Sequence, residues 1–161
     1  MVVGLVAVVV AIVVPRLIMS SPPIVMVPVP AGVPVPIRIR EIDRGSSEEV
    51  ELVASRMRET MVKVLGVERG TTMYSMDWLV QRVRWHLDPE NTNGRVFLAE
   101  EPSRKIVGHA IARIDPAEAG HAFGYLSTVF VEPRMRNQGV ATLFLEHVER
   151  WFREMKMPKI I

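Results

Sequence analysis

The residues that could do chemistry lie in one loop between a β-type run and a helix. The run ends at Val131, Pro133 cannot continue a strand interior, and an amphipathic segment follows Gly139. The start of a helix presents unpaired N–H groups and a partial positive charge, which favour an anion. Glycine lets the backbone approach that anion closely, and Ala141 keeps the first turn slim. The layout predicts a phosphate-binding turn.

The loop also matches a known signature. Arg136-x-x-Gly139-x-Ala141 resembles the acetyl-coenzyme A signature of the GNAT superfamily of N-acetyltransferases, and residues 124–133 resemble that superfamily's fourth strand. The resemblance implies an enzyme that moves an acetyl group from acetyl-CoA to a primary amine. For a lone glycine the alternative is a plain strand-to-helix connection, and the extended match argues against it.

The resemblance further implies how the coenzyme binds. Backbone groups of Val129, Phe130 and Val131 would pair with pantetheine as an added strand does. Backbone N–H groups of the loop and first helical turn would bind the pyrophosphate. These groups belong to Arg136, Asn137, Gln138, Gly139, Val140, Ala141 and Thr142. The side chains of Arg134 and Arg136 would either reach the phosphates or stay solvated.

Tyr125 is the candidate catalytic residue. Many relatives place a glutamate on the fourth strand, four residues before the first pantetheine-pairing position, where this chain has Tyr125. A tyrosine, with a pKa of about 10, is a poor base at neutral pH, but it could orient a water or the acceptor. Packing of its ring on a helix is the alternative. Tyr74, Trp78 and Trp85 lie where relatives build the acceptor pocket, with core packing as the alternative for both tryptophans.

No metal site is predicted, because no two histidines and a carboxylate have ligand spacing. Strand alternation places His109 on the same face as Val107 and Ile111, as a core histidine. Glu132, at the end of a strand, is expected at the surface.

Local patterns predict the elements that position this loop. Residues 37–42 alternate as a half-buried strand, and Ser46-x-x-Glu49 is a capping box that starts a helix ending at Gly66 or Gly70. Further elements are a helix over 75–87, strands over 95–100, 105–115 and 124–131, a helix over 138–155 and a strand from 158. The order β-α-α-β-β-β-α-β predicts an α/β (α+β) protein. A mixed central sheet flanked by helices, the GNAT-like acyl-CoA N-acyltransferase fold, agrees with that order.

The chain divides by composition into an apolar Pro/Val-rich extension, residues 1–36, and a GNAT domain, residues 37–161. The apolar run over 1–14 falls short of the about 20 residues of a spanning helix and lacks a signal peptide's positive start. An extended arm, an irregular membrane anchor and a start-site artefact remain as alternatives.

The family pattern normally continues after the fifth strand with a helix and two strands, and residues 37–161 end before them. The missing helix often supplies a tyrosine that protonates the leaving thiolate, and the strands often wall the acceptor site. A truncated, non-catalytic domain that binds CoA or a partner subunit is therefore the alternative function. An unpaired edge at 158–161 would also favour a homodimer.

Composition narrows the partners. The 161 residues fit one domain, and the lack of cysteine excludes a disulfide framework and a Cys nucleophile. A net charge of +2, with no basic block interleaved with aromatics, suits an anionic ligand without indicating nucleic acid. We expect a cytoplasmic protein that binds acetyl-CoA and an amine acceptor, with membrane association through residues 1–36 as the alternative. The acceptor is not predicted, because the residues that select it are scattered.

Overall fold

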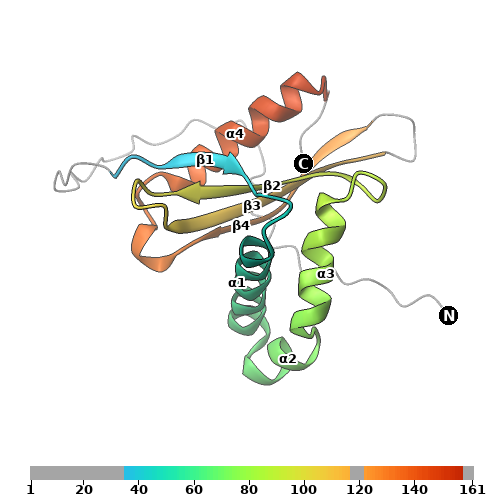
Figure 1. The fold of residues 1–161 in the computed structure, drawn as a ribbon, viewed down its shortest axis with the longest axis vertical. Coiled ribbons are helices and arrows are strands. Elements are labelled where there is room, and N and C mark those ends of the chain that lie inside the picture. The colour runs from blue at the N-terminus through green and yellow to red at the C-terminus, as the bar shows by residue number, and fades with distance from the viewer. Residues whose placement is uncertain (1–34, 117–121, 158–161) are drawn as a thin grey trace, which may run out of the picture.

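The computed structural model describes residues 35–116 and 122–157 (Figure 1). Their elements are β1 (Arg38–Glu41), α1 (Ser47–Leu65), α2 (Val67–Thr72), α3 (Met76–Leu87), β2 (Asn93–Glu100), β3 (Ile106–Asp115), β4 (Phe123–Val131), a 3₁₀ turn η1 (Pro133–Met135) and α4 (Val140–Glu154). The predicted α+β class and the order of its strands and long helices are confirmed. The short helix α2 was not predicted, and the strand expected from residue 158 lies outside the described residues.

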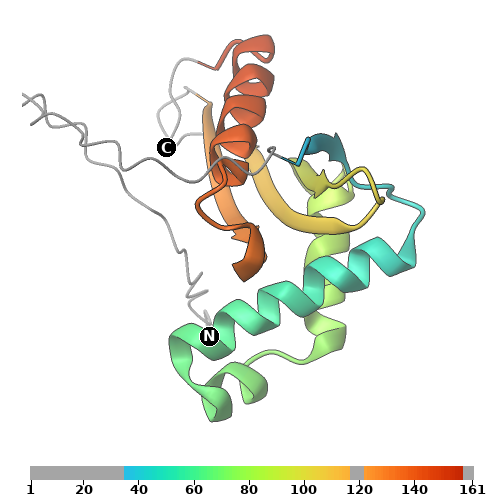
Figure 2. The same cartoon turned by 90° about the vertical axis from the view of Figure 1, so that its left-hand side faces the viewer.

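The strands form a four-stranded sheet in the order β1-β2-β3-β4, with every neighbouring pair antiparallel. The expected mixed sheet would need a parallel strand at 158–161, which the structure does not describe. Helices α1 and α3 lie against one face of the sheet and α4 against the other (Figures 1 and 2). The sheet is thus the middle layer of three.

An apolar cluster fills each of the two layers beside the sheet. The buried cluster under α1 and α3 contains Ile42, Val50, Val53, Ala54, Leu79, Val83, Leu87, Val96, Leu98, Ile106 and Ile111. The buried cluster under α4 contains Phe97, Ala99, Val107, Ala110, Ala112, Met135, Val140, Phe144, Val148, Trp151 and Phe152. Burial on both faces explains why β2 and β3 read as nearly continuous apolar runs rather than as alternating ones.

The helix ends follow local capping chemistry. The Ser46 side chain accepts a hydrogen bond from the Glu49 N–H at 3.2 Å and begins α1, as predicted. Of the two predicted ends, Gly66 is the correct one, since it caps α1 with a φ of 84°. Gly70 lies inside α2, where a Cβ atom would sit 2.5 Å from the Val62 Cα. Gly70 therefore serves close packing of α2 on α1.

Two irregularities in strand pairing change which face some side chains reach. The β2–β3 register shifts at Ala99/Glu100, so Val107 lies in the α4 cluster while Ile111 lies in the other. The prediction that Val107 and Ile111 share a face is wrong for this reason. In the β3–β4 ladder, Ile111 pairs with Thr128 and Ala112 with Leu126, which leaves Ser127 as an extra residue.

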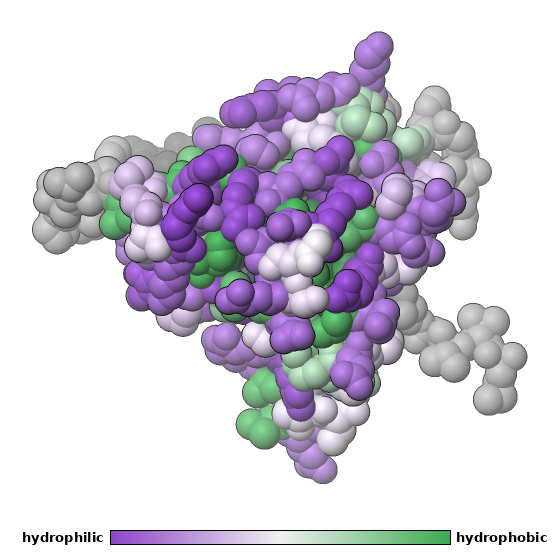
Figure 3. Space-filling model, viewed as in Figure 1, coloured by the Kyte–Doolittle hydropathy of each residue, from purple (hydrophilic) through white to green (hydrophobic). Residues whose placement is uncertain are grey.

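The face shown in Figure 3 is mostly hydrophilic, with apolar side chains in separate patches. Exposed apolar residues near α2 include Val64, Val67 and Met73, at 52%, 72% and 50% exposure. Within residues 35–116 and 122–157, none of the helices combines the length and apolar character needed to cross a membrane.

Candidate functional site

The predicted pantetheine-pairing segment lies at the end of β4, an edge strand of the described sheet. Its three residues have different surroundings. Val129 is 37% exposed, Phe130 is buried, and Val131 packs against the α4 cluster. Within the described residues β4 pairs only with β3, so the backbone groups along its other edge have no strand partner. That edge is the one to which an extended ligand could add.

The chain leaves β4 through η1 and turns into α4 with two left-handed residues. Asn137 has a φ of 60° and Gly139 a φ of 83°. A Cβ atom at Gly139 would meet nothing within 4 Å, so the glycine serves its backbone conformation rather than a lack of space. The buried side chains of Met135 and Val140 anchor the two ends of this turn in the α4 cluster.

The N-terminus of α4 differs from those of α1 and α3. Ser46 and Ser75 cap the other two helices, and acidic residues occupy their first turns. At α4 no side chain caps the helix, and its first turn holds no acidic residue. Neither a capping side chain nor a carboxylate of the first turn therefore competes with an anion for the N–H groups at the start of α4.

Residues 136–142, the seven residues predicted to bind the pyrophosphate, form this turn and the start of α4. Val140 is buried, and the other six are exposed. Arg136 Nε donates a hydrogen bond to the Val131 carbonyl at 3.0 Å, and Gln138 Nε2 donates to the Arg134 carbonyl at 2.8 Å. These two side chains hold the turn against the end of β4.

Arg134 is neither free for a phosphate nor simply solvated. Its guanidinium forms a bidentate pair with Glu101 at 2.9 and 3.0 Å, and Nε lies 3.1 Å from Glu132. The bonds to Glu101, followed by those to Glu132, raise the pKa of Arg134. Arg134 thus fastens the loop to the β2–β3 connection.

Glu132, expected at the surface, contacts a buried arginine. Arg56 of α1 is 5% exposed, and its Nη2 donates to Glu132 Oε1 at 2.7 Å and to the Ile106 carbonyl at 2.6 Å. The guanidinium carbon also lies 5.2 Å from the centre of the Phe130 ring. Burial lowers the pKa of Arg56 despite the nearby Glu132 carboxylate. This pair joins α1 to the end of β4, directly before the loop.

Tyr125 lies under the guanidinium of an arginine on the neighbouring strand. It pairs with Arg113 in the β3–β4 ladder, and the Arg113 guanidinium carbon lies 4.7 Å from the Tyr125 ring centre. Arg113 Nε donates to Asp115 Oδ2 at 2.8 Å. Arg113 was not predicted to be a neighbour of Tyr125. The signal that could have found it is the register of two antiparallel strands counted outward from their connection.

His109 is a core residue and cannot reach a ligand. It is fully buried and stacks on Phe130 at 5.6 Å with an interplanar angle of 8°. Burial, followed by the charge of Arg56, lowers its pKa to about 3. Within the described residues, no three His, Cys, Asp or Glu side chains are grouped to hold a metal ion.

The tryptophans of the expected acceptor region lie outside the two buried clusters. Trp78 is 38% exposed and contacts Tyr74 with ring centres 4.5 Å apart. Trp85 is half-buried, and the Arg82 guanidinium carbon lies 4.3 Å from its ring centre.

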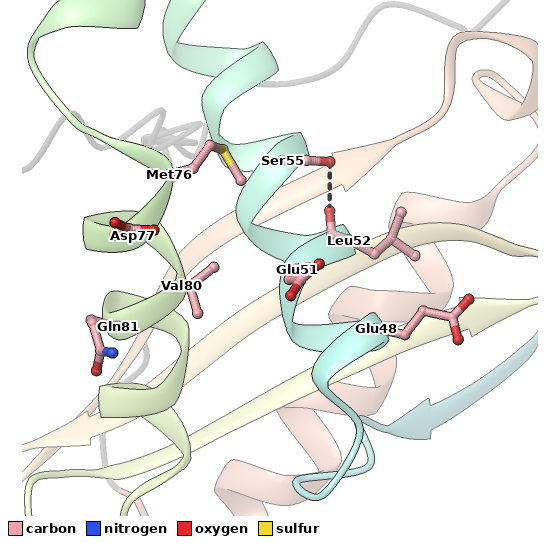
Figure 4. A pocket seen from close by; sticks show the side chains of 8 residues that line it. All are labelled: Glu48, Glu51, Leu52, Ser55, Met76, Asp77, Val80 and Gln81. Carbon is pink, nitrogen blue, oxygen red and sulfur yellow. Dashed lines mark hydrogen bonds between the residues drawn. The ribbon is translucent and has the colours of Figure 1, made fainter.

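A separate hollow of about 930 Å³ lies between α1 and α3 (Figure 4). Its lining consists of Glu48, Glu51, Leu52, Ser55, Met76, Asp77, Val80 and Gln81. No lining residue comes from β4 or α4, so this hollow is not part of the predicted coenzyme site. In this hollow the Ser55 hydroxyl donates a hydrogen bond to the Leu52 carbonyl at 3.2 Å (Figure 4).

Solved structures share this fold at low sequence identity. A possible acetyltransferase from Clostridium difficile 630 is 16% identical, with a TM-score of 0.62 over 77% of this chain and 76% of its own. A predicted acetyltransferase with acetyl-CoA from Clostridium acetobutylicum is 21% identical, with a TM-score of 0.60 over 78% and 79%. Glucosamine-6-phosphate N-acetyltransferase from Arabidopsis thaliana is 16% identical, with a TM-score of 0.55 over 78% and 80%.

A search of curated proteins finds no match. A family model, described as the acetyltransferase (GNAT) family, matches residues 61–161. The match covers β2, β3, β4, the turn from β4 into α4, and α4 itself, which include the elements that form the candidate site. Because it extends over more than half of the chain, the protein belongs to the acetyltransferase (GNAT) family.

Proposed function

We propose that this protein is an N-acetyltransferase that transfers the acetyl group of acetyl-CoA to a primary amine. The observation that carries the proposal is the open edge of β4 leading, through a left-handed turn at Gly139, into the uncapped N-terminus of α4. Family membership supports acetyl transfer, and the structural relative with acetyl-CoA supports the choice of donor. The lack of cysteine agrees with a cytoplasmic enzyme.

The residues present fit the coenzyme's two polar parts. The N–H groups of residues 136–142 would bind the pyrophosphate, because α4 begins with neither a capping side chain nor an acid. Backbone groups of Val129, Phe130 and Val131 would pair with the pantetheine amides. The carbonyl of Val131 already accepts one bond from Arg136, so it would use its second lone pair.

Acetyl transfer requires the protein to position two reactants and to accept a proton. The lone pair of a neutral amine attacks the thioester carbonyl carbon, the C–S bond breaks, and the amine proton leaves with the thiolate or with water. The chain must hold the two reactants together, exclude competing geometries and receive the proton. We assign Tyr125 the task of orienting the amine or a water, because its hydroxyl lies on a half-buried side chain of the same strand that would bind pantetheine.

Two measurements on the full chain test the proposal. Acetyl-CoA should raise the melting temperature, and release of free CoA thiol should depend on added primary amine. A melting curve unmoved by millimolar acetyl-CoA would refute coenzyme binding. A shifted curve without turnover on any primary amine would favour the non-catalytic CoA-binding domain instead.

A further inference from the structure

One row of residues crosses the sheet beside α3. Gly94 of β2 pairs with Arg113 of β3, and Arg113 pairs with Tyr125 of β4. Residues paired across neighbouring strands share a face. A Cβ atom on Gly94 would lie 2.6 Å from the His86 carbonyl oxygen, so α3 lies directly on this row. Arg113 and Tyr125 therefore extend from beneath α3 toward the β4 edge.

Arg82 of α3 lies one turn before His86 and adds a second guanidinium to this region. It is half-buried and stacks on Trp85. Within the described part of the chain, Arg82 makes no hydrogen bond or ion pair. Arg40, which is also half-buried, does have such partners, since it pairs with Glu49 and Glu100.

The charge balance around Arg82 is positive. Arg113 and Asp115 form a pair, which leaves Arg82 without a compensating carboxylate among the described residues. Burial and then the charge of Arg113 lower the pKa of Arg82, although Asp115 opposes them. Burial, with the charges of Arg82 and Arg113, also lowers the pKa of His86 to about 3. The two guanidinium groups of Arg82 and Arg113 thus share one nearby carboxylate, that of Asp115, and the local potential is positive.

The proposed function, on which the inference rests, places Arg82 and Arg113 relative to the acetyl donor. The coenzyme phosphates would lie at the start of α4, after the C-terminal end of β4. Pantetheine would run back along β4, so the thioester would approach the half of the strand that holds Tyr125. The acceptor amine must arrive at that same point.

We infer that Arg82 and Arg113 bind an anionic group, a carboxylate or a phosphate, carried by the acceptor amine. A guanidinium donates paired N–H groups that match both anions. Among the described residues no group accepts a hydrogen bond from Arg82, while Arg113 uses Nε for Asp115 and keeps its terminal nitrogens unbonded. The ring of Trp85 holds Arg82 in place from one side. The acceptor class is therefore a small acidic amine.

Matched amines test this assignment in the full-length protein. L-alanine is compared with L-alaninamide, and 2-aminoethyl phosphate with ethanolamine. We expect a kcat/KM at least about tenfold higher for the acidic member of one pair, as for a hydrogen bond to a charged group. The pair that shows the preference distinguishes a carboxylate from a phosphate. Arg82→Gln should remove the preference by lowering kcat/KM for the acidic amine toward that of its neutral partner.

Arg84→Gln is the control, because Arg84 is on the same helix, is more exposed than Arg82, and its replacement removes the same charge. It should preserve the preference. Equal rates within both pairs, or equal effects of the two substitutions, would overturn the inference while leaving acetyl transfer intact.

A binding measurement covers the case in which no amine is acetylated. 2-Aminoethyl phosphate and L-alanine are titrated in the presence of excess CoA, added to fill the proposed α4 site, and binding is followed by NMR. Binding that Arg82→Gln weakens and Arg84→Gln does not would support the anion site even if the proposed function failed. Absence of such binding would overturn it.

Discussion

At the scale of single residues, the turn from β4 into α4 depends on the conformation of Gly139. Because its φ is 83° and a Cβ atom there would meet nothing within 4 Å, alanine would introduce strain but no clash. We expect Gly139→Ala to cost about 1 kcal/mol of folding stability and to retain acetyl-CoA binding. Gly139→Glu should abolish the ligand-induced rise in melting temperature, because it adds a negative charge beside the pyrophosphate. Equal behaviour of the two variants would place the phosphates elsewhere.

Tyr125 allows a test of chemistry at a single oxygen. Tyr125→Phe keeps the ring under the Arg113 guanidinium and removes only the hydroxyl. If that hydroxyl orients the amine or a water, kcat/KM should fall by about tenfold or more, which corresponds to about 1.4 kcal/mol, with little change in acetyl-CoA affinity. An unchanged kcat/KM would leave Tyr125 with a packing role.

The lowered pKa of His109 predicts that the free energy of unfolding depends on pH. Its pKa is about 6.5 when unfolded and about 3 when folded, so the unfolded chain binds more protons between these values. The contribution of His109 to the free energy of unfolding should therefore be fully present above pH 6.5 and decrease as the pH falls. At about pH 5 the loss from this residue is about 2 kcal/mol.

His109→Leu provides the measurement, since leucine fills a similar volume and cannot titrate. Urea unfolding at about pH 8 and about pH 5 should show a smaller pH-dependent loss in the variant by about 2 kcal/mol. His86, whose pKa is also lowered to about 3, is present in both proteins and cancels in the comparison. An identical loss in the two proteins would mean that His109 becomes protonated in the folded state.

At the scale of elements, the Arg56–Glu132 pair connects α1 with the end of β4. Glu132→Gln would leave the buried Arg56 charge uncompensated, and we expect a loss of about 2–3 kcal/mol in unfolding free energy. Glu149→Gln removes the carboxylate of an exposed pair with Arg153 and should cost about 0.5 kcal/mol or less. Chemical denaturation of both variants gives the comparison.

A double-mutant cycle separates the pair from its surroundings. Arg56→Met combined with Glu132→Gln should cost less than the sum of the two single changes, because Arg56 is then no longer buried without its paired carboxylate. Additive costs would show that the two side chains do not stabilise one another.

At the scale of the whole molecule, the sheet has an apolar cluster on each face, built from residues 37–157. We expect a chain without residues 1–36 to fold and to keep its response to acetyl-CoA. A ligand that binds only the folded state adds about 2.7 kcal/mol at a hundredfold excess over Kd, in either chain. Aggregation of the shortened chain would instead identify residues 1–36 as a cover for an apolar surface.

Much of the candidate site is local in sequence, and the sequence by itself determined that part. Ser46 marks the start of α1, and the spacing of apolar residues marks α4. The turn from β4 into α4 is a short run of consecutive residues between Val131 and Val140. Such signals depend on backbone preferences and hydrogen bonds within a few residues, so no distant contact is needed to predict them.

The tertiary structure alone decided which charges meet. Arg56 and Glu132 are 76 residues apart in sequence, and Arg134 and Glu101 are 33 apart. The sequence also could not place Val107 under α4, because the bulge between β2 and β3 moves the side chains beyond it to the opposite face of the sheet. Strand register arises from packing of the whole sheet against its helices, and a shift of one residue reverses every side chain that follows.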